Sequence, residues 1–159
     1  MKNILEEIAA RTRERIAKEK TCISVSELEN RIQEVNKNAR KRITFLQALQ
    51  KDGMSYICEV KKASPSKGLI APDFPYLAIA KEYEQAGASA ISCLTEPFYF
   101  QGADQYLREI AAAVQIPVLR KDFTVDEYMI YQAKSLGASA VLFICAILDD
   151  GELRAYRQL

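Results

Sequence analysis

The sequence contains no histidine. This absence excludes Ser-His-Asp and Cys-His nucleophilic catalysis and removes the commonest metal ligand in proteins. Any acid–base chemistry must therefore be carried out by Lys, Glu, Asp or Tyr side chains. The four cysteines form no Cys-x-x-Cys pair and mostly sit in apolar runs, so we expect reduced core thiols rather than disulfides or a zinc site. We expect no metal site.

Long apolar runs and an excess of charge are also missing. No run approaches the roughly 20 residues of a membrane span, and the opening MKNILEEIAARTRER carries charges where a signal peptide needs an apolar stretch. With 22 basic and 21 acidic residues, the chain has no global field to attract nucleic acid or a membrane surface. We predict a cytoplasmic protein with neither partner, which binds any anionic ligand locally.

The first part of the chain has helical periodicity. Apolar residues recur at helical spacing near the N-terminus, and Ser26 with Glu29 predicts a capping box that starts a second helix. A third short helix ends at a Gly-containing turn. These helices are expected at about residues 2–20, 26–38 and 45–50, within an N-terminal helical extension of residues 1–52.

The rest of the chain repeats a strand-then-helix pattern. Strands are expected at 56–60, 90–95, 117–120 and 140–145, and helices at 76–85, 103–114, 126–136 and from about 149. This spacing predicts successive βα crossovers in a parallel sheet, so residues 53–159 are interpreted as the first half of an α/β (β/α)₈ TIM barrel. An echo between residues 86–91 and 136–141 fits either convergent turn chemistry or duplication. A doubly wound sheet is the rival, but no G-x-G-x-x-G motif supports it.

Four βα units make half a barrel, because a complete (β/α)₈ domain needs at least about 200 residues. The 159 residues would leave two strand edges unpaired and the inner sheet face exposed. We therefore expect a truncated chain, or one that self-associates or associates with a C-terminal half-barrel.

Charged residues cluster where the predicted strands end, which is where barrel enzymes place their working groups. Glu59 and Lys61 share one face of the first strand, and alternation separates Lys121 and Phe123 from Arg120 and Asp122 on the third. Two lysines could then meet across the barrel mouth. The alternative is a structural ion pair on the first strand and an Arg120–Lys121 doublet that is only surface charge.

Two further segments carry weaker signals. The stretch Ser64-Pro65-Ser66-Lys67-Gly68 predicts a mobile loop with hydroxyls, amides and a cation for an anionic ligand, although any loop favours such residues. The run Phe98-Tyr99-Phe100 could line an aryl pocket or simply pack in the core.

The segment 57–68, ICEVKKASPSKG, resembles the first-strand signature E-V-K-x-x-S-P-S of the indole-3-glycerol phosphate synthase family. LTEPFYFQG at 94–102 and PVLRKDF at 117–123 resemble its second- and third-strand blocks. The resemblance implies that Lys121 is the general acid, that Lys61 stabilises charge or assists dehydration, and that Glu59 positions Lys61. It implies substrate contacts for Ser64, Pro65, Phe100 and Phe123.

The implied reaction converts the phosphorylated small-molecule substrate 1-(2-carboxyphenylamino)-1-deoxyribulose 5-phosphate to indole-3-glycerol phosphate in tryptophan biosynthesis, without a cofactor. The family's general-base glutamate and phosphate-binding residues come from strands five to eight, so we expect little turnover from these 159 residues alone. Two alternatives stay open: a related phosphate-binding barrel such as phosphoribosylanthranilate isomerase, and a non-catalytic half-barrel structural unit.

Overall fold

The computed structural model describes residues 3–38 and 43–159, and its centre is a four-stranded parallel sheet. The strands in spatial order are β1 (Ile57–Val60), β4 (Ala90–Leu94), β5 (Val118–Lys121) and β6 (Ala140–Val141). Each strand of this sheet lies beside the one that precedes it, as successive βα units do around a barrel. The predicted fold class is confirmed as an α/β arrangement that is consistent with part of a (β/α)₈ barrel.

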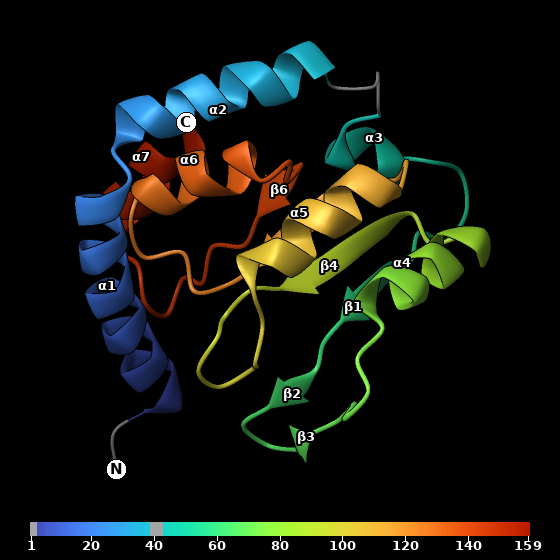
Figure 1. The fold of residues 1–159 in the computed structure, drawn as a ribbon, viewed down its shortest axis with the longest axis horizontal. Helices are drawn as coiled ribbons and strands as arrows, with labels where there is room; N and C mark the ends of the chain where they lie inside the picture. The colour runs from blue at the N-terminus through green and yellow to red at the C-terminus, as the bar shows by residue number, and fades with distance from the viewer. Residues whose placement is uncertain (1–2, 39–42) are drawn as a thin grey trace.

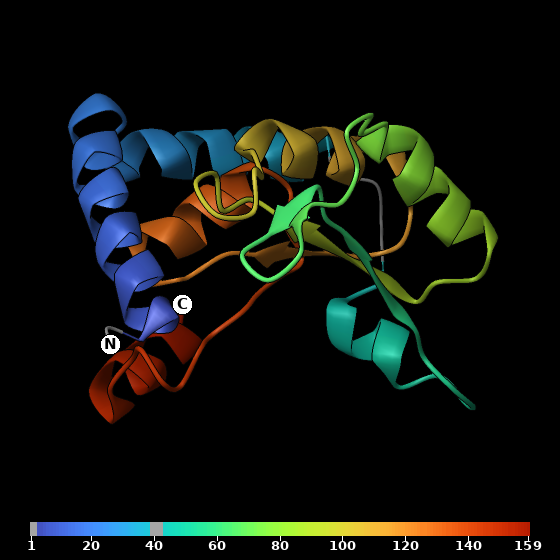
Figure 2. The same ribbon diagram turned by 90° about the horizontal axis from the view of Figure 1, so that it is seen from below.

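Three helices connect the sheet strands, and a fourth follows β6. They are α4 (Tyr76–Gln85), α5 (Asp104–Ala113), α6 (Tyr128–Ser135) and α7 (Asp150–Arg157). Figure 2 shows α4 and α5 on one side of the sheet and α3 on the other. Apolar side chains from the strands and from α4, α5 and α6 form the first core, which includes Val60, Ile91, Leu107, Ile110, Val118 and Ala133. Because side chains alternate along a strand, this packing leaves the opposite face of β1 to Glu59.

Three helices precede the sheet, as expected: α1 (Ile4–Cys22), α2 (Val25–Asn38) and α3 (Phe45–Leu49). Residue 2 of the first predicted helix lies outside the described residues. The predicted cap of the second helix was wrong, because the Glu27 amide donates to Ser24 Oγ at 3.2 Å, two residues before Ser26. Capping boxes occur instead at Thr44 with Gln47 and at Asp149 with Glu152.

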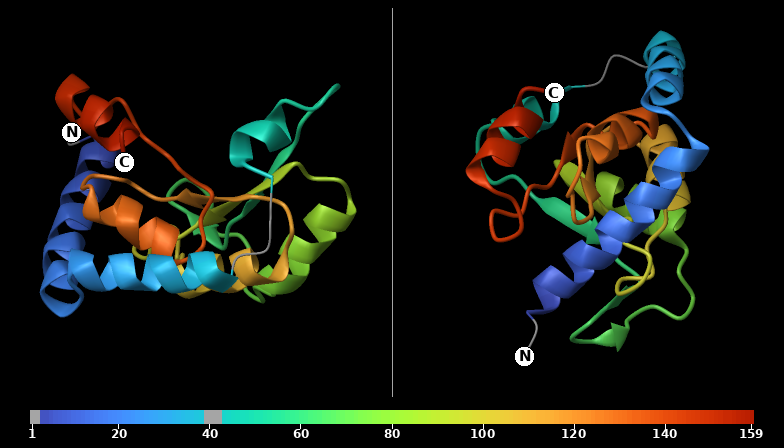
Figure 3. Two further views of the ribbon diagram at one scale, coloured as in Figure 1. Left: turned by 90° about the horizontal axis from the view of Figure 1, so that it is seen from above. Right: turned by 90° about the vertical axis from the view of Figure 1, so that its left-hand side faces the viewer.

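Helices α1 and α2 build a second core with α6 and the residues that precede it. Figure 1 shows α2 lying along α6, and the right-hand view of Figure 3 shows α1 running across the same end of the molecule. The buried members of this core are Ile8, Ala9, Ile16, Leu28, Phe123, Val125, Tyr128 and Met129. Helices α1 and α2 are thus packed against the βα units over an apolar surface of their own.

Two predicted segments differ in the structure. The expected strand 140–145 is a strand only at Ala140 and Val141, because β6 pairs with β5 alone among the described strands and the ladder ends at Arg120↔Val141. The expected loop at 64–68 is a tight hairpin between β2 (Ala63–Ser64) and β3 (Gly68–Leu69). Gly68 has φ of 64°, a left-handed backbone that glycine adopts without strain, which lets the chain turn here.

The cysteines follow the prediction only in part. All four are free thiols, but only Cys93 is buried, whereas Cys22 and Cys145 are exposed. Burial raises the pKa of Cys93 to about 12, so it stays a neutral thiol in the first core. Among the described residues, no helix is both long enough and apolar enough to cross a membrane.

A close backbone approach fixes the loop that leaves β4. A Cβ atom added to Gly102 would lie 2.5 Å from the Leu94 carbonyl oxygen and 2.8 Å from the Thr95 carbonyl carbon. The Gly102 amide also donates to the Glu96 carbonyl oxygen at 2.8 Å. Both obstacles are backbone atoms, so a larger residue cannot be accommodated by a change of rotamer.

We therefore expect Gly102→Ala to lower the free energy of unfolding by about 2 kcal/mol or more, as overpacking against a fixed backbone does. Gly151→Ala is the control, because its Cβ would meet only the Asp149 side chain, at 3.1 Å, in the first turn of α7. That change should alter the free energy by less than about 1 kcal/mol. Urea unfolding measures both, and equal midpoints for the two variants would contradict the expectation.

Candidate active site

Two lysines share one carboxylate on the sheet face opposite the first core. Lys61 Nζ lies 2.6 Å from Glu59 Oε1, and Lys121 Nζ lies 4.0 Å from Glu59 Oε2. Each of these three side chains is 32% exposed, so all of them remain accessible to a ligand. The structure thus brings together the three residues predicted for catalysis. The cluster keeps one positive charge unbalanced, which favours an anionic ligand.

The strand register places a serine beside this cluster. Ser92 pairs with Glu59 across β1 and β4, and Ser92 Oγ donates to Glu59 Oε2 at 3.4 Å. Leu94 is paired with Lys121 on the other side of β4. The carboxylate of Glu59 is therefore contacted by Ser92 from β4 and by Lys121 from β5, and it orients the ammonium groups of Lys61 and Lys121. The sequence pattern gave no reason to select Ser92, because a serine inside an apolar strand is also common in cores.

Two aromatic rings border the cluster. Lys121 Nζ lies 5.9 Å from the centroid of the Phe100 ring, and the rings of Phe100 and Phe123 are 6.4 Å apart between centroids. Phe123 is 6% exposed and belongs to the second core, whereas Phe100 is partly buried and packs against that core. The Phe100 ring thus lies near Lys121 with the Phe123 ring beside it, and the Phe100 ring is the more accessible of the two.

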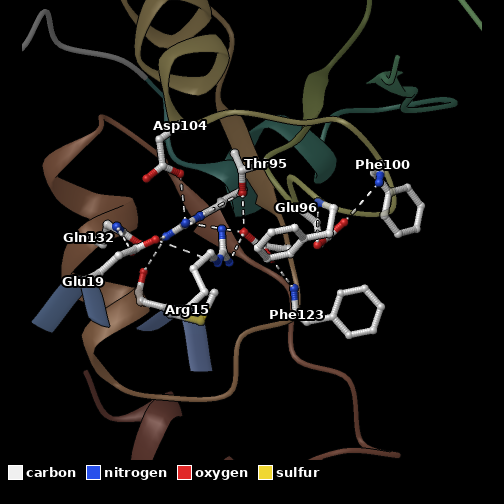
Figure 4. A network of polar contacts seen from close by, with 12 residues as sticks. Arg15, Glu19, Thr95, Glu96, Phe100, Asp104, Phe123 and Gln132 are labelled. Atoms are coloured by element: carbon white, nitrogen blue, oxygen red, sulfur yellow. Dashed lines mark hydrogen bonds and ion pairs between the residues drawn. The ribbon is translucent and has the colours of Figure 1, made fainter. Parts of the chain in front are cut away.

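A buried carboxylate holds the Phe100 backbone. Glu96 is 1% exposed and accepts the amide N–H groups of Phe98, Tyr99 and Phe100 at 3.0, 2.7 and 3.0 Å. Figure 4 shows this side chain reaching toward the Phe100 amide. Hydrogen bonds from backbone amides to a carboxylate are stronger than those between neutral groups. The conformation of this loop is therefore held by one of its own side chains, that of Glu96.

The hairpin residues are not part of this arrangement. Ser64 Oγ accepts the Lys67 amide at 3.2 Å inside the turn, and Pro65 is exposed. In the described part of the chain, neither residue has a hydrogen bond or ion pair to Glu59, Lys61 or Lys121. Their predicted contacts with substrate remain untested predictions, and the hydroxyl of Ser64 is already used locally.

Arg120 is not surface charge, contrary to one of the sequence interpretations. Its side chain is fully buried, and all five N–H groups are used. Nε donates to Thr95 Oγ1 at 3.0 Å, and the two terminal nitrogens donate to the oxygens of Met129, Gln132, Asp104 and Asp122 at 2.8–3.4 Å. Figure 4 shows the labelled partners converging at the end of β5. Strand alternation places this network directly behind Lys121.

Asp122 links this network to the N-terminal helix. Its Oδ2 accepts from Thr95 at 2.7 Å and from Arg15 of α1 at 3.0 Å, while its Oδ1 accepts the Phe123 amide at 2.8 Å. Burial alone would raise the pKa of Asp122, but the charges of Arg120 and Arg15 and the hydrogen bond from Thr95 outweigh it and lower the pKa. Asp122 is therefore an ionised carboxylate in the interior.

Sequence reasoning did not identify the residues that support the site. They are Ser92, Glu96, Asp122, Arg120 and Arg15. For Arg120 and Asp122 a signal existed, because they alternate with Lys121 and a two-sided sheet must bury one of the two faces. For Arg15 no local signal existed, since it resembles any charged residue on an amphipathic helix.

Consecutive parallel βα units with charged groups at the carboxyl ends of the strands define a protein of the (β/α)₈-barrel class. Residues 5–159 match the family model described as indole-3-glycerol phosphate synthase. The chain belongs to this family, as its sequence motifs indicated.

Individual relatives agree with the family match. The chain is 53% identical over 156 residues to the indole-3-glycerol phosphate synthase of Lacticaseibacillus paracasei, an alignment that covers 98% of this chain and 59% of the relative. It is 51% identical over 154 residues to that of Ruminiclostridium cellulolyticum, covering 96% and 58%. It is 50% identical over 154 residues to that of Endomicrobium trichonymphae, again covering 96% and 58%. The chain thus spans about three fifths of the length of these relatives.

Because Asp122 is ionised in the folded chain, the free energy of unfolding should depend on pH. Because its pKa is lower in the folded state than the usual value of about 3.9, its ionisation stabilises the fold above that pH, and this contribution is lost as pH falls through the folded pKa. At pH 7 we expect Asp122→Asn to cost about 3–5 kcal/mol, because two guanidinium groups lose their buried counter-charge. The difference from the parent chain should shrink below about pH 4. Urea unfolding between pH 3 and pH 7 measures it, and a difference that stays constant with pH would contradict the assignment.

Proposed function

We propose that this chain supplies the acid and the aryl-binding part of an indole-3-glycerol phosphate synthase site. The observation that carries the proposal is the sharing of the Glu59 carboxylate by Lys61 and Lys121, next to the Phe100 ring. The substrate would be 1-(2-carboxyphenylamino)-1-deoxyribulose 5-phosphate. Its carboxylate suits the unbalanced positive charge, and its ring suits the aromatic border of the cluster.

In the proposed reaction, the ring carbon that bears the carboxylate attacks the ketone carbon of the ribulose chain. The Lys121 ammonium donates its proton to the ketone oxygen, which would otherwise become an alkoxide. The bond to the carboxyl group then breaks, carbon dioxide leaves, and the electron pair restores the aromatic ring. Loss of the new hydroxyl as water, with a proton from the adjacent carbon, gives the indole.

The other two charged residues have supporting roles in this proposal. Lys61 stabilises negative charge on the oxygen during ring closure or assists the departure of water. Glu59 orients Lys61 through the 2.6 Å ion pair and is within 4.0 Å of Lys121, so it sets the distance between the two ammonium groups. Ser64 and Pro65 would also contact the substrate.

We further propose that residues 1–52 form a helical extension and residues 53–159 the first half of a barrel, in a cytoplasmic enzyme. The described edges of the sheet are β1 and β6, each with one neighbour in the described residues. These edges suit pairing with a second copy of the chain or with a C-terminal half-barrel. Of the two, only the half-barrel would supply the groups for the phosphate and for deprotonation.

The test measures fluorescence-detected formation of indole-3-glycerol phosphate from the proposed substrate. The chain is assayed alone and after mixing with the C-terminal barrel segment of the Lacticaseibacillus paracasei relative. We expect activity on mixing, and a loss of about 10²–10⁴-fold with Lys121→Ala because the general acid is removed. Lys81→Ala, an exposed lysine on α4, is the matched control and should keep full activity.

No activity in a mixture shown to be folded and associated would contradict the proposed function and favour a non-catalytic structural unit. Activity that Lys121→Ala leaves unchanged would contradict the assignment of the acid while keeping the reaction.

A further inference from the structure

Four charged residues of α1 lie four positions apart: Glu7, Arg11, Arg15 and Glu19. Residues at this spacing project from the same face of a helix, so they form a charged stripe along α1. At a rise of about 1.5 Å per residue, the stripe extends for about 18 Å. Every member of the stripe contacts a residue of the βα units.

The amino-terminal half of the stripe holds the loop that carries Phe100. Glu7 Oε1 accepts the Tyr99 hydroxyl at 2.6 Å, and the Arg11 guanidinium carbon lies 4.0 Å from the centroid of the Phe98 ring. A guanidinium over an aromatic face is attracted by the ring quadrupole. Since the amides of residues 98–100 are all bound to Glu96, a contact at Tyr99 or Phe98 also places the Phe100 backbone.

The carboxyl-terminal half holds the segment that carries Phe123. Arg15 Nη2 donates to Asp122 Oδ2 at 3.0 Å, and the same carboxylate accepts the Phe123 amide on its other oxygen. Glu19 Oε2 accepts Gln132 Nε2 at 2.8 Å, and Gln132 Oε1 accepts from Arg120. The Arg15 side chain is 11% exposed and that of Asp122 is 0% exposed, so this ion pair is largely shielded from water.

The two aromatic segments are joined at their bases, where Thr95 Oγ1 donates to Asp122 Oδ2 at 2.7 Å, and α1 adds a second link farther along each segment. Within the described residues, no hydrogen bond joins residues 96–102 directly to residues 122–125, although the Phe100 and Phe123 rings are 6.4 Å apart. Figure 4 shows the two rings side by side at one edge of the polar network. Beyond the Thr95–Asp122 hydrogen bond at their bases, both segments are bonded to one helix, which links the position of each to the other.

We propose that the charged stripe of α1 positions the two aromatic residues of the site, with Arg15 as its central positioning residue. Arg15 acts through Asp122 on Phe123 and on the adjoining Lys121, and Glu7 with Arg11 acts through Tyr99 and Phe98 on Phe100. This inference rests on the proposed function for the identity of the ligand, but the coupling between α1 and the two segments is independent of it.

The experiment uses the whole chain and two readouts. Hydrogen exchange at the Phe123 and Phe100 amides, followed by NMR, reports on the two segments directly. Fluorescence titration with 2-aminobenzoate reports on binding of an aryl carboxylate. The variants are Arg15→Met, which keeps much of the side chain but removes its charge, Arg15→Lys, and Glu7→Gln.

Ile16→Val is the matched control. Ile16 is buried on the same helix in the second core, so this change weakens the packing of α1 without touching the stripe. All variants are compared at the same temperature below their melting transitions, so that a general loss of stability affects the control as well.

We expect Arg15→Met to speed exchange at Phe123 and to weaken binding of 2-aminobenzoate, each by about tenfold or more relative to Ile16→Val. A hydrogen bond between charged groups contributes at least that factor to an equilibrium constant. Arg15→Lys should recover part of both effects, because an ammonium can still donate to Asp122. Glu7→Gln should speed exchange at Phe100 while leaving Phe123 unchanged.

Equal exchange and equal affinity for Arg15→Met and Ile16→Val would overturn the proposal and leave Arg15 with a purely structural role. If the parent chain does not bind 2-aminobenzoate, the proposed ligand class fails, and exchange alone decides the inference. Acceleration confined to the two amides then supports positioning by α1, whereas acceleration spread over the whole chain overturns it.

Discussion

The burial of the Arg120 guanidinium is the constraint on which the rest of this structure depends. A charged group with no access to water must have all of its N–H groups paired, or the fold loses several kcal/mol. Its partners come from the residue after β4, from α5 and α6, and from the residue after β5, which ties these elements to one point. The ends of β4 and β5 are positioned by this arrangement, because Thr95 and Asp122 directly follow them. Strand β1, which carries Glu59, is held in turn by its ladder to β4.

Side-chain alternation at the end of β5 places the buried network on one face of the sheet and the proposed acid, Lys121, on the other. Arg120 and Asp122 face the helices, while Lys121 faces the open side of the sheet and remains 32% exposed. The three residues are consecutive, so a shift of one residue in register would exchange the buried and the accessible charges. The network behind the sheet thereby fixes which ammonium group is presented to a ligand.

The sequence predicted the regular elements well because their signals are local. Helix α4 lies where its periodicity placed it, at Tyr76–Gln85, and Glu59, Lys61 and Lys121 meet because strand alternation and parallel order require it. The alternation at Arg120 and Asp122 was visible, but it did not reveal which face was buried. The hairpin at Ser64 was missed because a loop composition does not distinguish a tight turn from an open one.

What the sequence could not provide is the link between distant segments. Arg15 and Asp122 are 107 residues apart, and Glu19 and Gln132 are 113 apart, so no local pattern connects them. Their pairing results from the packing of α1 against α6 and the residues after β5.

These separations affect the order in which the chain can fold. Helix α1 is synthesised before its side-chain partners in the βα units, which run from Phe98 to Ile147. At a translation rate of about 5–20 residues per second, the apolar face around Ile8 and Ile16 therefore waits roughly 5–20 s for them. Contacts of such high sequence separation also form late, because closing a long loop costs entropy before any contact is gained. Helix α1 is thus among the last of the described elements to dock, and its docking completes the polar network behind Lys121.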